Sequence, residues 1–115
     1  MLQDKKGDDL KALKIKIIKF ISDDQPGFVE CIFYDALNKK HIVQEKIPVV
    51  TEKHLDADSN YPQDGVIACE IVKESRDLKG NTIVTIDTSL PWGVDTIEGL
   101  SQFDVLEQQL IELDR

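Results

Sequence analysis

Short apolar runs separated by turn residues dominate this chain, and few of them repeat with a helical period. Most runs are rich in Ile, Val and Phe, which is typical of strands. Six strands with short links predict a mainly β fold, a small antiparallel barrel or bent sheet on the scale of OB or SH3-like barrels. The predicted strands cover 13–22, 28–35, 41–50, 66–74, 82–88 and 102–106.

The first predicted strand changes phase in its middle. Leu13, Ile15 and Ile17 alternate with lysines, but the apolar pattern then continues at Ile18 and Phe20. A shift of one residue moves side chains to the opposite face of a sheet. The pattern therefore predicts a bulge here, or a strand that changes the face it buries.

The alternation in the other predicted strands indicates which side chains form the core. The core candidates are Ile67, Cys69, Ile71, Val84 and Ile86, while Val29, Cys31 and Phe33 share one face of the second strand and Phe103 and Val105 lie in the last one. After the last strand, apolar residues at 106, 110 and 113 are spaced by four and three. This spacing predicts a short C-terminal helical turn within 107–113, packed on the sheet.

The length of 115 residues fits one domain. We expect a polar, flexible N-terminal segment at 1–12 and a single β domain at 13–115. The longest apolar-rich stretch, 12–21, is short and broken by three lysines, so it does not predict a membrane span.

The two cysteines, Cys31 and Cys69, lie inside apolar runs and belong to no CxxC pair. We predict that both are buried, reduced thiols, although neighbouring strands would also permit a disulfide. Together with a polar start of the chain that lacks a signal-like apolar run, this indicates a cytoplasmic location.

The net charge of −8 is concentrated in the second half of the chain. Residues 1–54 hold ten Lys and nine Asp or Glu, a net of +1, whereas residues 55–115 hold four Lys or Arg and thirteen Asp or Glu, a net of −9. Such a surface repels nucleic-acid phosphates and anionic lipid, and it attracts basic partners.

The loop 51–65 contains an alternating acidic string that includes Asp56, Asp58 and Asn60. An EF-hand that starts at Asp56 needs Gly at its sixth position and Glu at its twelfth. This chain has Tyr61 and Ile67 there, so the EF-hand pattern fails. Two alternatives stay open: another kind of calcium site, with Asp64 as an additional ligand, and a polar loop held by Asx turns.

Trp92 is the only tryptophan and lies between a proline and a glycine in the loop 89–101. With Asp95 and Glu98 nearby, it has the character of an anchor for a binding partner. The alternative is that the indole folds back and plugs one end of the barrel.

No residue pattern predicts catalysis, a metal or a cofactor. His41 and His54 lack the close spacing of zinc ligands, and a cysteine within an apolar strand is a poor nucleophile. The carboxylates Glu70, Glu74 and Asp87 are expected on neighbouring strands, where a solvated acidic face is the simplest interpretation. We therefore predict no catalytic residue and no cofactor.

Several strings resemble those of an uncharacterised group of small, stand-alone bacterial β proteins. The resemblance covers 14–110 and implies a β fold and a bacterial origin, but no activity and no functional residues. The strings are Phe28-Val29-Glu30-Cys31, Leu55-Asp56-Ala57-Asp58-Ser59, Tyr61-Pro62-Gln63, Gly65-Val66-Ile67 and Pro91-Trp92-Gly93-Val94.

The sequence as a whole favours a non-enzymatic, acidic binding protein that engages a basic protein partner, for example an immunity or antidote protein. Two alternatives remain: an OB-like module for single-stranded nucleic acid, which the acidity disfavours, and an enzyme that uses clustered carboxylates or a metal. An exposed edge near Pro48 or at the last strand leaves a homodimer open. The predicted partner-binding residues are Trp92, Asp95, Glu98, Asp56, Asp58 and Asp64.

Overall fold

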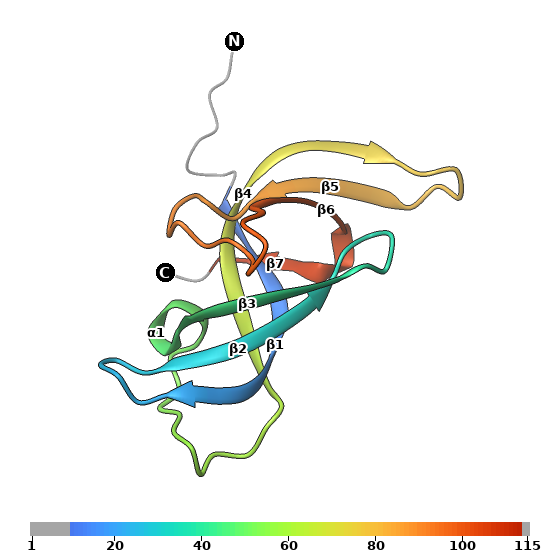
Figure 1. Ribbon diagram of the computed structural model, residues 1–115. Coiled ribbons are helices and arrows are strands. Elements are labelled where there is room, and N and C mark those ends of the chain that lie inside the picture. The colour runs from blue at the N-terminus through green and yellow to red at the C-terminus, as the bar shows by residue number, and fades with distance from the viewer. Residues whose placement is uncertain (1–9, 114–115) are drawn as a thin grey trace.

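The computed structural model describes residues 10–113, and its strands form one curled antiparallel sheet shaped as a half-barrel (Figure 1). The strand order is β3-β2-β1-β4-β5-β6, and β7 pairs with β1. This confirms the predicted mainly β, bent antiparallel sheet. The elements are β1 (Leu10–Ser22), β2 (Phe28–Tyr34), β3 (Lys40–Lys46), α1 (Ile47–Val50), β4 (Gln63–Arg76), β5 (Thr82–Asp87), β6 (Gln102–Leu106), a 3-10 helix (Glu107–Gln109) and β7 (Leu110–Glu112).

The long strand β1 joins the two halves of the sheet. One of its edges pairs with β4 from Leu10 to Ile17, while the other pairs first with β7 and then, from Lys16 onward, with β2. The register with β2 shifts between Ile17 and Lys19. The phase change in the sequence is therefore a bulge, and it bends β1 where it passes from one half of the sheet to the other.

The core lies on the inner face of the half-barrel. Four of the five core candidates are buried, and the fifth, Ile71, is only partly buried against the core. The shared face of Val29, Cys31 and Phe33 is buried as well, as are Phe103 and Val105. Both cysteines are buried and free, as predicted. Burial raises the pKa of each thiol to about 12, so neither is a thiolate at neutral pH.

The prediction of a strand through 41–50 is wrong for its last four residues. β3 ends at Lys46, and Ile47–Val50 forms the single turn α1, with Pro48 in its first turn. Proline lacks an N–H and has a fixed φ, which suits the start of a helix but not a paired strand. The turn also buries Ile47 and Val50 in the core.

The predicted C-terminal helical turn is shorter than expected. Only Glu107–Gln109 is helical, and the following residues form β7, which pairs with β1 opposite Lys11–Leu13. The spacing of the apolar residues fits either a helical turn or a short strand. The edge of β1 that is open beside Lys11–Leu13 pairs with these residues, and this pairing makes them a strand. β1 itself begins at Leu10, three residues before the predicted start, and residues 1–9 lie outside the described part of the chain.

Three hairpin loops share one hydrogen-bonded turn, built on Asp35, Asp77 and Thr96. In each turn, the side-chain oxygen of this first residue accepts the N–H groups two and four positions later. The first and fifth residues also bond through their main chains. The fourth residue has a positive φ, which suits Asn38, Gly80 and Gly99. These turns hold aliphatic side chains outward: Leu37 is 90% exposed, Leu78 is fully exposed and Ile97 is also exposed.

Gly65 marks a close contact that holds β4 against the rest of the core. A Cβ at this position would lie 2.9 Å from both Cδ1 of Ile17 and the carbonyl oxygen of Val50. Because the second of these atoms belongs to the main chain, only a backbone shift would relieve the overlap.

We predict that Gly65→Ala lowers the free energy of unfolding by about 1–3 kcal/mol, as overpacking in a well-packed core does. Urea denaturation followed by circular dichroism measures this loss. Ser75→Ala, at an exposed site on the same strand, is the control and should stay near the wild-type stability. Equal stability of Gly65→Ala and the wild type would contradict the close contact.

Candidate functional site

A cavity of about 810 Å³ opens between α1, the start of β1, the start of β4 and the end of β7, and we call it the Trp92 groove. Its volume is within the range of ligand-binding clefts. The groove is lined by Leu10, Ala12, Pro48, Val49, Val50, Thr51, Glu52, Lys53, Asp64, Gly65, Val66, Pro91, Trp92, Ile111, Glu112 and Leu113.

Trp92 stands at the rim of this groove and is 64% exposed, so the interpretation as a core plug is wrong. The loop buries Val94 instead. The Val94 N–H donates to the carbonyl of Thr88 over 3.0 Å, and the Thr88 hydroxyl donates to the carbonyl of Val94 over 2.7 Å. Since Gly93 is tied to Ser89 in the same way, the main chain on the C-terminal side of Trp92 is fixed and the indole is presented to solvent.

The walls of the groove are mainly aliphatic, and carboxylates mark its rim. Glu52, Asp64 and Glu112 contribute three negative charges, against one positive charge from Lys53. Lys16 binds Asp64 in an ion pair and lowers the pKa of that carboxyl, and Lys11 lies 2.6 Å from Glu112. Carboxylates therefore lie around the apolar lining of the groove, and two of them, Asp64 and Glu112, are paired with lysines.

The structure brings together two of the six predicted partner-binding residues, Trp92 and Asp64. Asp95 and Glu98 are exposed on the same loop as Trp92 but do not line the groove. Asp56 and Asp58 belong to the loop between α1 and β4, which extends to the bottom of Figure 1, away from β5 and β6.

The Asp56 loop is held by the Asx turns that one alternative predicted. The Asp56 carboxylate accepts the N–H of Asp58 over 2.9 Å and the hydroxyl of Ser59 over 3.3 Å. The hydroxyl of Tyr61 closes the loop by donating to the carbonyl of Asp56. Within residues 10–113, no three His, Cys, Asp or Glu side chains converge as metal ligands.

A second cavity, of about 650 Å³, lies where β2 and β7 diverge from β1. Its lining includes Lys14, Phe33 and Tyr34. The side chain of Gln109 links β6 to β2 beside this cavity. Its Nε2 donates to the Tyr34 carbonyl, and its Oε1 accepts the Leu106 N–H, both over 2.8 Å.

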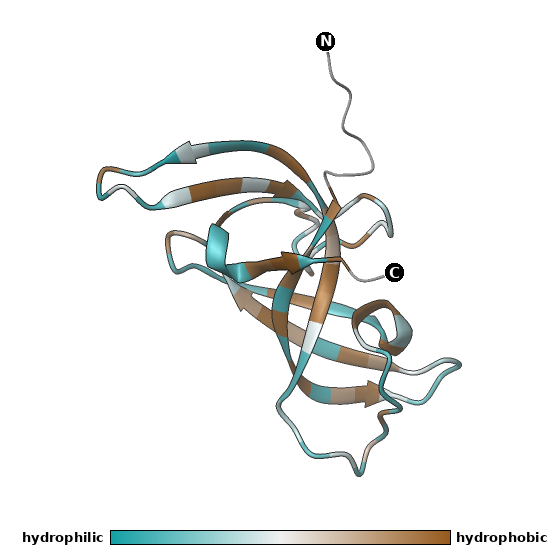
Figure 2. Ribbon diagram, turned by 180° about the vertical axis from the view of Figure 1, so that it is seen from behind, coloured by the Kyte–Doolittle hydropathy of each residue, from teal (hydrophilic) through white to brown (hydrophobic). Residues whose placement is uncertain are grey.

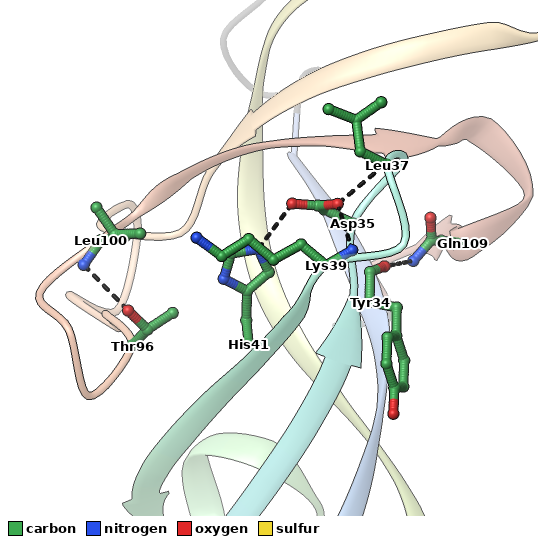
Figure 3. A network of polar contacts seen from close by, with 8 residues as sticks. All are labelled: Tyr34, Asp35, Leu37, Lys39, His41, Thr96, Leu100 and Gln109. Atoms are coloured by element: carbon green, nitrogen blue, oxygen red, sulfur yellow. Dashed lines mark hydrogen bonds and ion pairs between the residues drawn. The ribbon is translucent and has the colours of Figure 1, made fainter.

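His41 is buried in a polar clamp with Asp35 (Figure 3). It is 4% exposed, and its Nε2 lies 2.8 Å from Oδ2 of Asp35. The ring packs against both Phe33 and Phe103, at centroid distances of 5.1 and 4.8 Å, and the two phenyl rings also contact each other. The carboxylate accepts the Nε2 proton, while Nδ1 is buried without a hydrogen-bond partner. Sequence reasoning considered His41 only as a zinc ligand and missed Asp35.

Asp35 combines its bond to His41 with the turn at the tip of the β2–β3 hairpin. Burial by itself would raise the pKa of Asp35, but hydrogen bonds from His41 and from the N–H groups of Lys39 and Leu37 outweigh it and hold this pKa below its usual value. The same turn reaches β6, because the Ala36 N–H donates to the carbonyl of Asp104 over 2.8 Å. The turn at Asp35 therefore ties the β2–β3 hairpin, at one end of the strand order, to β6 at the other end.

The predicted carboxylate group lies on neighbouring strands, as expected. Glu70 is directly opposite Asp87, and Glu74 is opposite Val84. The Asp87 carboxylate accepts the N–H and the hydroxyl of Ser89. None of the three carboxylates lines the Trp92 groove.

Comparison with protein-family models, curated proteins and solved structures gave no match. None of the helices within residues 10–113 combines the length and the apolar character needed to cross a membrane.

We predict that Asp35→Ala lowers the free energy of unfolding by about 2–4 kcal/mol, because it leaves a buried imidazole N–H and two turn N–H groups without their acceptor. Asp77→Ala, which removes the same side chain from an exposed copy of the same turn, is the matched control and should cost clearly less. Chemical denaturation measures both. Equal losses of unfolding free energy in the two variants would show that the bond between Asp35 and His41 does not stabilise the fold.

The contribution of Asp35 should also depend on pH. Its folded pKa is lowered, so its stabilisation is complete above the unfolded value of about 3.9 and is lost as the pH falls through the folded pKa. We expect the stability difference between the wild type and Asp35→Asn to shrink between pH 6 and about pH 3. Urea denaturation of both proteins across this interval measures it, and a constant difference would contradict the assignment.

Proposed function

We propose that the protein is a non-enzymatic binding module that holds a basic, apolar segment of a protein partner in the Trp92 groove. The observation that supports this most is Trp92 itself, a largely exposed indole at the rim of an apolar cleft, on a loop whose main chain is hydrogen-bonded after it. Tryptophan is enriched among the residues that dominate protein interfaces, because it buries a large area with few rotatable bonds.

The charge of the rim indicates the kind of segment that fits. An aliphatic or aromatic side chain would pack against the apolar lining residues Val49 and Ile111, beside Trp92 at the rim. Flanking Lys or Arg would approach Glu52, and would compete with Lys16 for Asp64 and with Lys11 for Glu112. The excess of acidic residues after position 55 extends this preference beyond the groove. Complementary charges of this kind accelerate the encounter of two binding partners and fix their relative orientation more than they raise the affinity.

The nucleic-acid alternative has less support from the surface. It requires unpaired lysines beside stacking aromatics. Tyr34 is exposed and shares a cavity with Lys14 and Lys16, but Lys16 is already paired with Asp64. Phe28, another aromatic residue of β2 that could stack on a base, is only partly exposed.

We predict that short peptides with a Leu or Phe flanked by Lys bind the wild type, and that Trp92→Ala weakens this binding by about tenfold or more, as loss of a central aromatic anchor does. Isothermal titration calorimetry with a Lys-flanked peptide measures the affinity. The same peptide with Glu in place of Lys should bind much more weakly, and its disadvantage should shrink at high salt.

Leu90→Ala is the matched control, since Leu90 is an exposed apolar residue on the same loop but does not line the groove. It should bind the peptide as the wild type does. Equal loss of binding in both variants would show that the loop has unfolded, and no loss in Trp92→Ala would overturn the proposed function.

A further inference from the structure

The hairpin formed by β4 and β5 extends beyond the body of the molecule as an arm, residues 72–83 (Figures 1 and 2). The register of the two strands shifts between Ile71 and Lys73, where the arm leaves the sheet. Residues 72–81 are exposed on both faces of the hairpin. A two-stranded hairpin without a packed face is only marginally stable in water, so this arm is suited to be covered by a partner.

The tip of the arm presents one apolar side chain in a fixed position. The Asp77 carboxylate accepts the N–H groups of Lys79 and Asn81, and the Gly80 N–H donates to the Asp77 carbonyl. These bonds turn the carboxylate inward and leave Leu78 at the apex, fully exposed. The arm is therefore preorganised to insert a leucine into an apolar site.

The charge of the arm is opposite to that of the surrounding half of the chain. Three of the four cationic residues after position 54, namely Lys73, Arg76 and Lys79, lie on it. Of its two carboxylates, Asp77 is bound by the turn, which leaves Glu74 on the strand. Leu78 flanked by Arg76 and Lys79 is thus the apolar, basic segment that the Trp92 groove is suited to hold.

The arm of a molecule is far from its own groove. Figures 1 and 2 show the tip of the arm at one end and α1, which lines the groove, at the other. The molecule is 48 Å along its longest axis. The segment can therefore reach a groove only on another molecule.

We propose that the partner is a second copy of this chain, and that the arm of one copy inserts Leu78 into the Trp92 groove of the next. This inference rests on the proposed function of the groove. The contact joins two different surfaces, so it is heterologous and each new copy again presents a free arm and a free groove. Assembly then grows with concentration unless a ring closes.

The test uses the complete chain and two complementary variants in sedimentation velocity. The wild type should increase in mean mass across the micromolar to millimolar range, and high salt should reduce this. Leu78→Asp has a groove but no functional arm, and Trp92→Ala has an arm but no functional groove. Each variant alone should stay at the 13.0 kDa monomer, whereas their mixture should form a 1:1 heterodimer and nothing larger.

Leu37→Asp is the control, because Leu37 is exposed on the same kind of turn but lies outside the arm. It should assemble as the wild type does. Assembly of Leu78→Asp alone, or failure of the mixture to form the heterodimer, would overturn the proposal. If the wild type remains monomeric while Lys-flanked peptides still bind it, the self-association fails and the proposed function stands.

Discussion

The pairing of β1 on both of its edges is the constraint on which the rest of the structure depends. This strand contacts β4 along one edge and β7 and β2 along the other, and its bulge bends the sheet into a half-barrel. The bend brings the inner faces of the two halves together around one core. The second cavity also follows from it, since β2 and β7 use different parts of the same edge.

Because the barrel is only half closed, local contacts hold its ends together. The turn at Asp35 is tied to β6 through Ala36, and the loop at Ile97 donates to the carbonyl of Ile42 on β3. The buried pair of His41 and Asp35 stabilises the first of these contacts. The same type of turn at Asp77 has no such tertiary bond in the described chain. One local motif therefore closes the half-barrel at Asp35 and forms an exposed hairpin tip at Asp77.

The fold class and most of the core could be predicted from the sequence, since alternation reports burial directly in half-buried strands. The bulge in β1 was visible as a phase change for the same reason. The errors fall where two structures share one pattern: Pro48 suits both an edge strand and a helix start, and the spacing of Leu106 and Leu110 suits both a helical turn and the start of β7.

The Trp92 groove could not be predicted as a unit, because its walls come from five segments that are distant in sequence. Composition indicated an acidic binding surface and Trp92 as its anchor, but only the fold places Asp64 beside it and moves Asp56 away. The repeated turn did leave a signal, since Asp or Thr is followed three positions later by Asn or Gly in all three loops.

The fluorescence of Trp92 tests the central claim most directly, because this is the only tryptophan in the chain. In the free protein, the largely exposed indole should emit at long wavelength and be quenched readily by acrylamide. Addition of a Lys-flanked leucine peptide should shift the emission to shorter wavelength and protect it from quenching, whereas the Glu-flanked peptide should leave it unchanged. If the Lys-flanked peptide binds and the emission of Trp92 does not change, the groove is not the binding site.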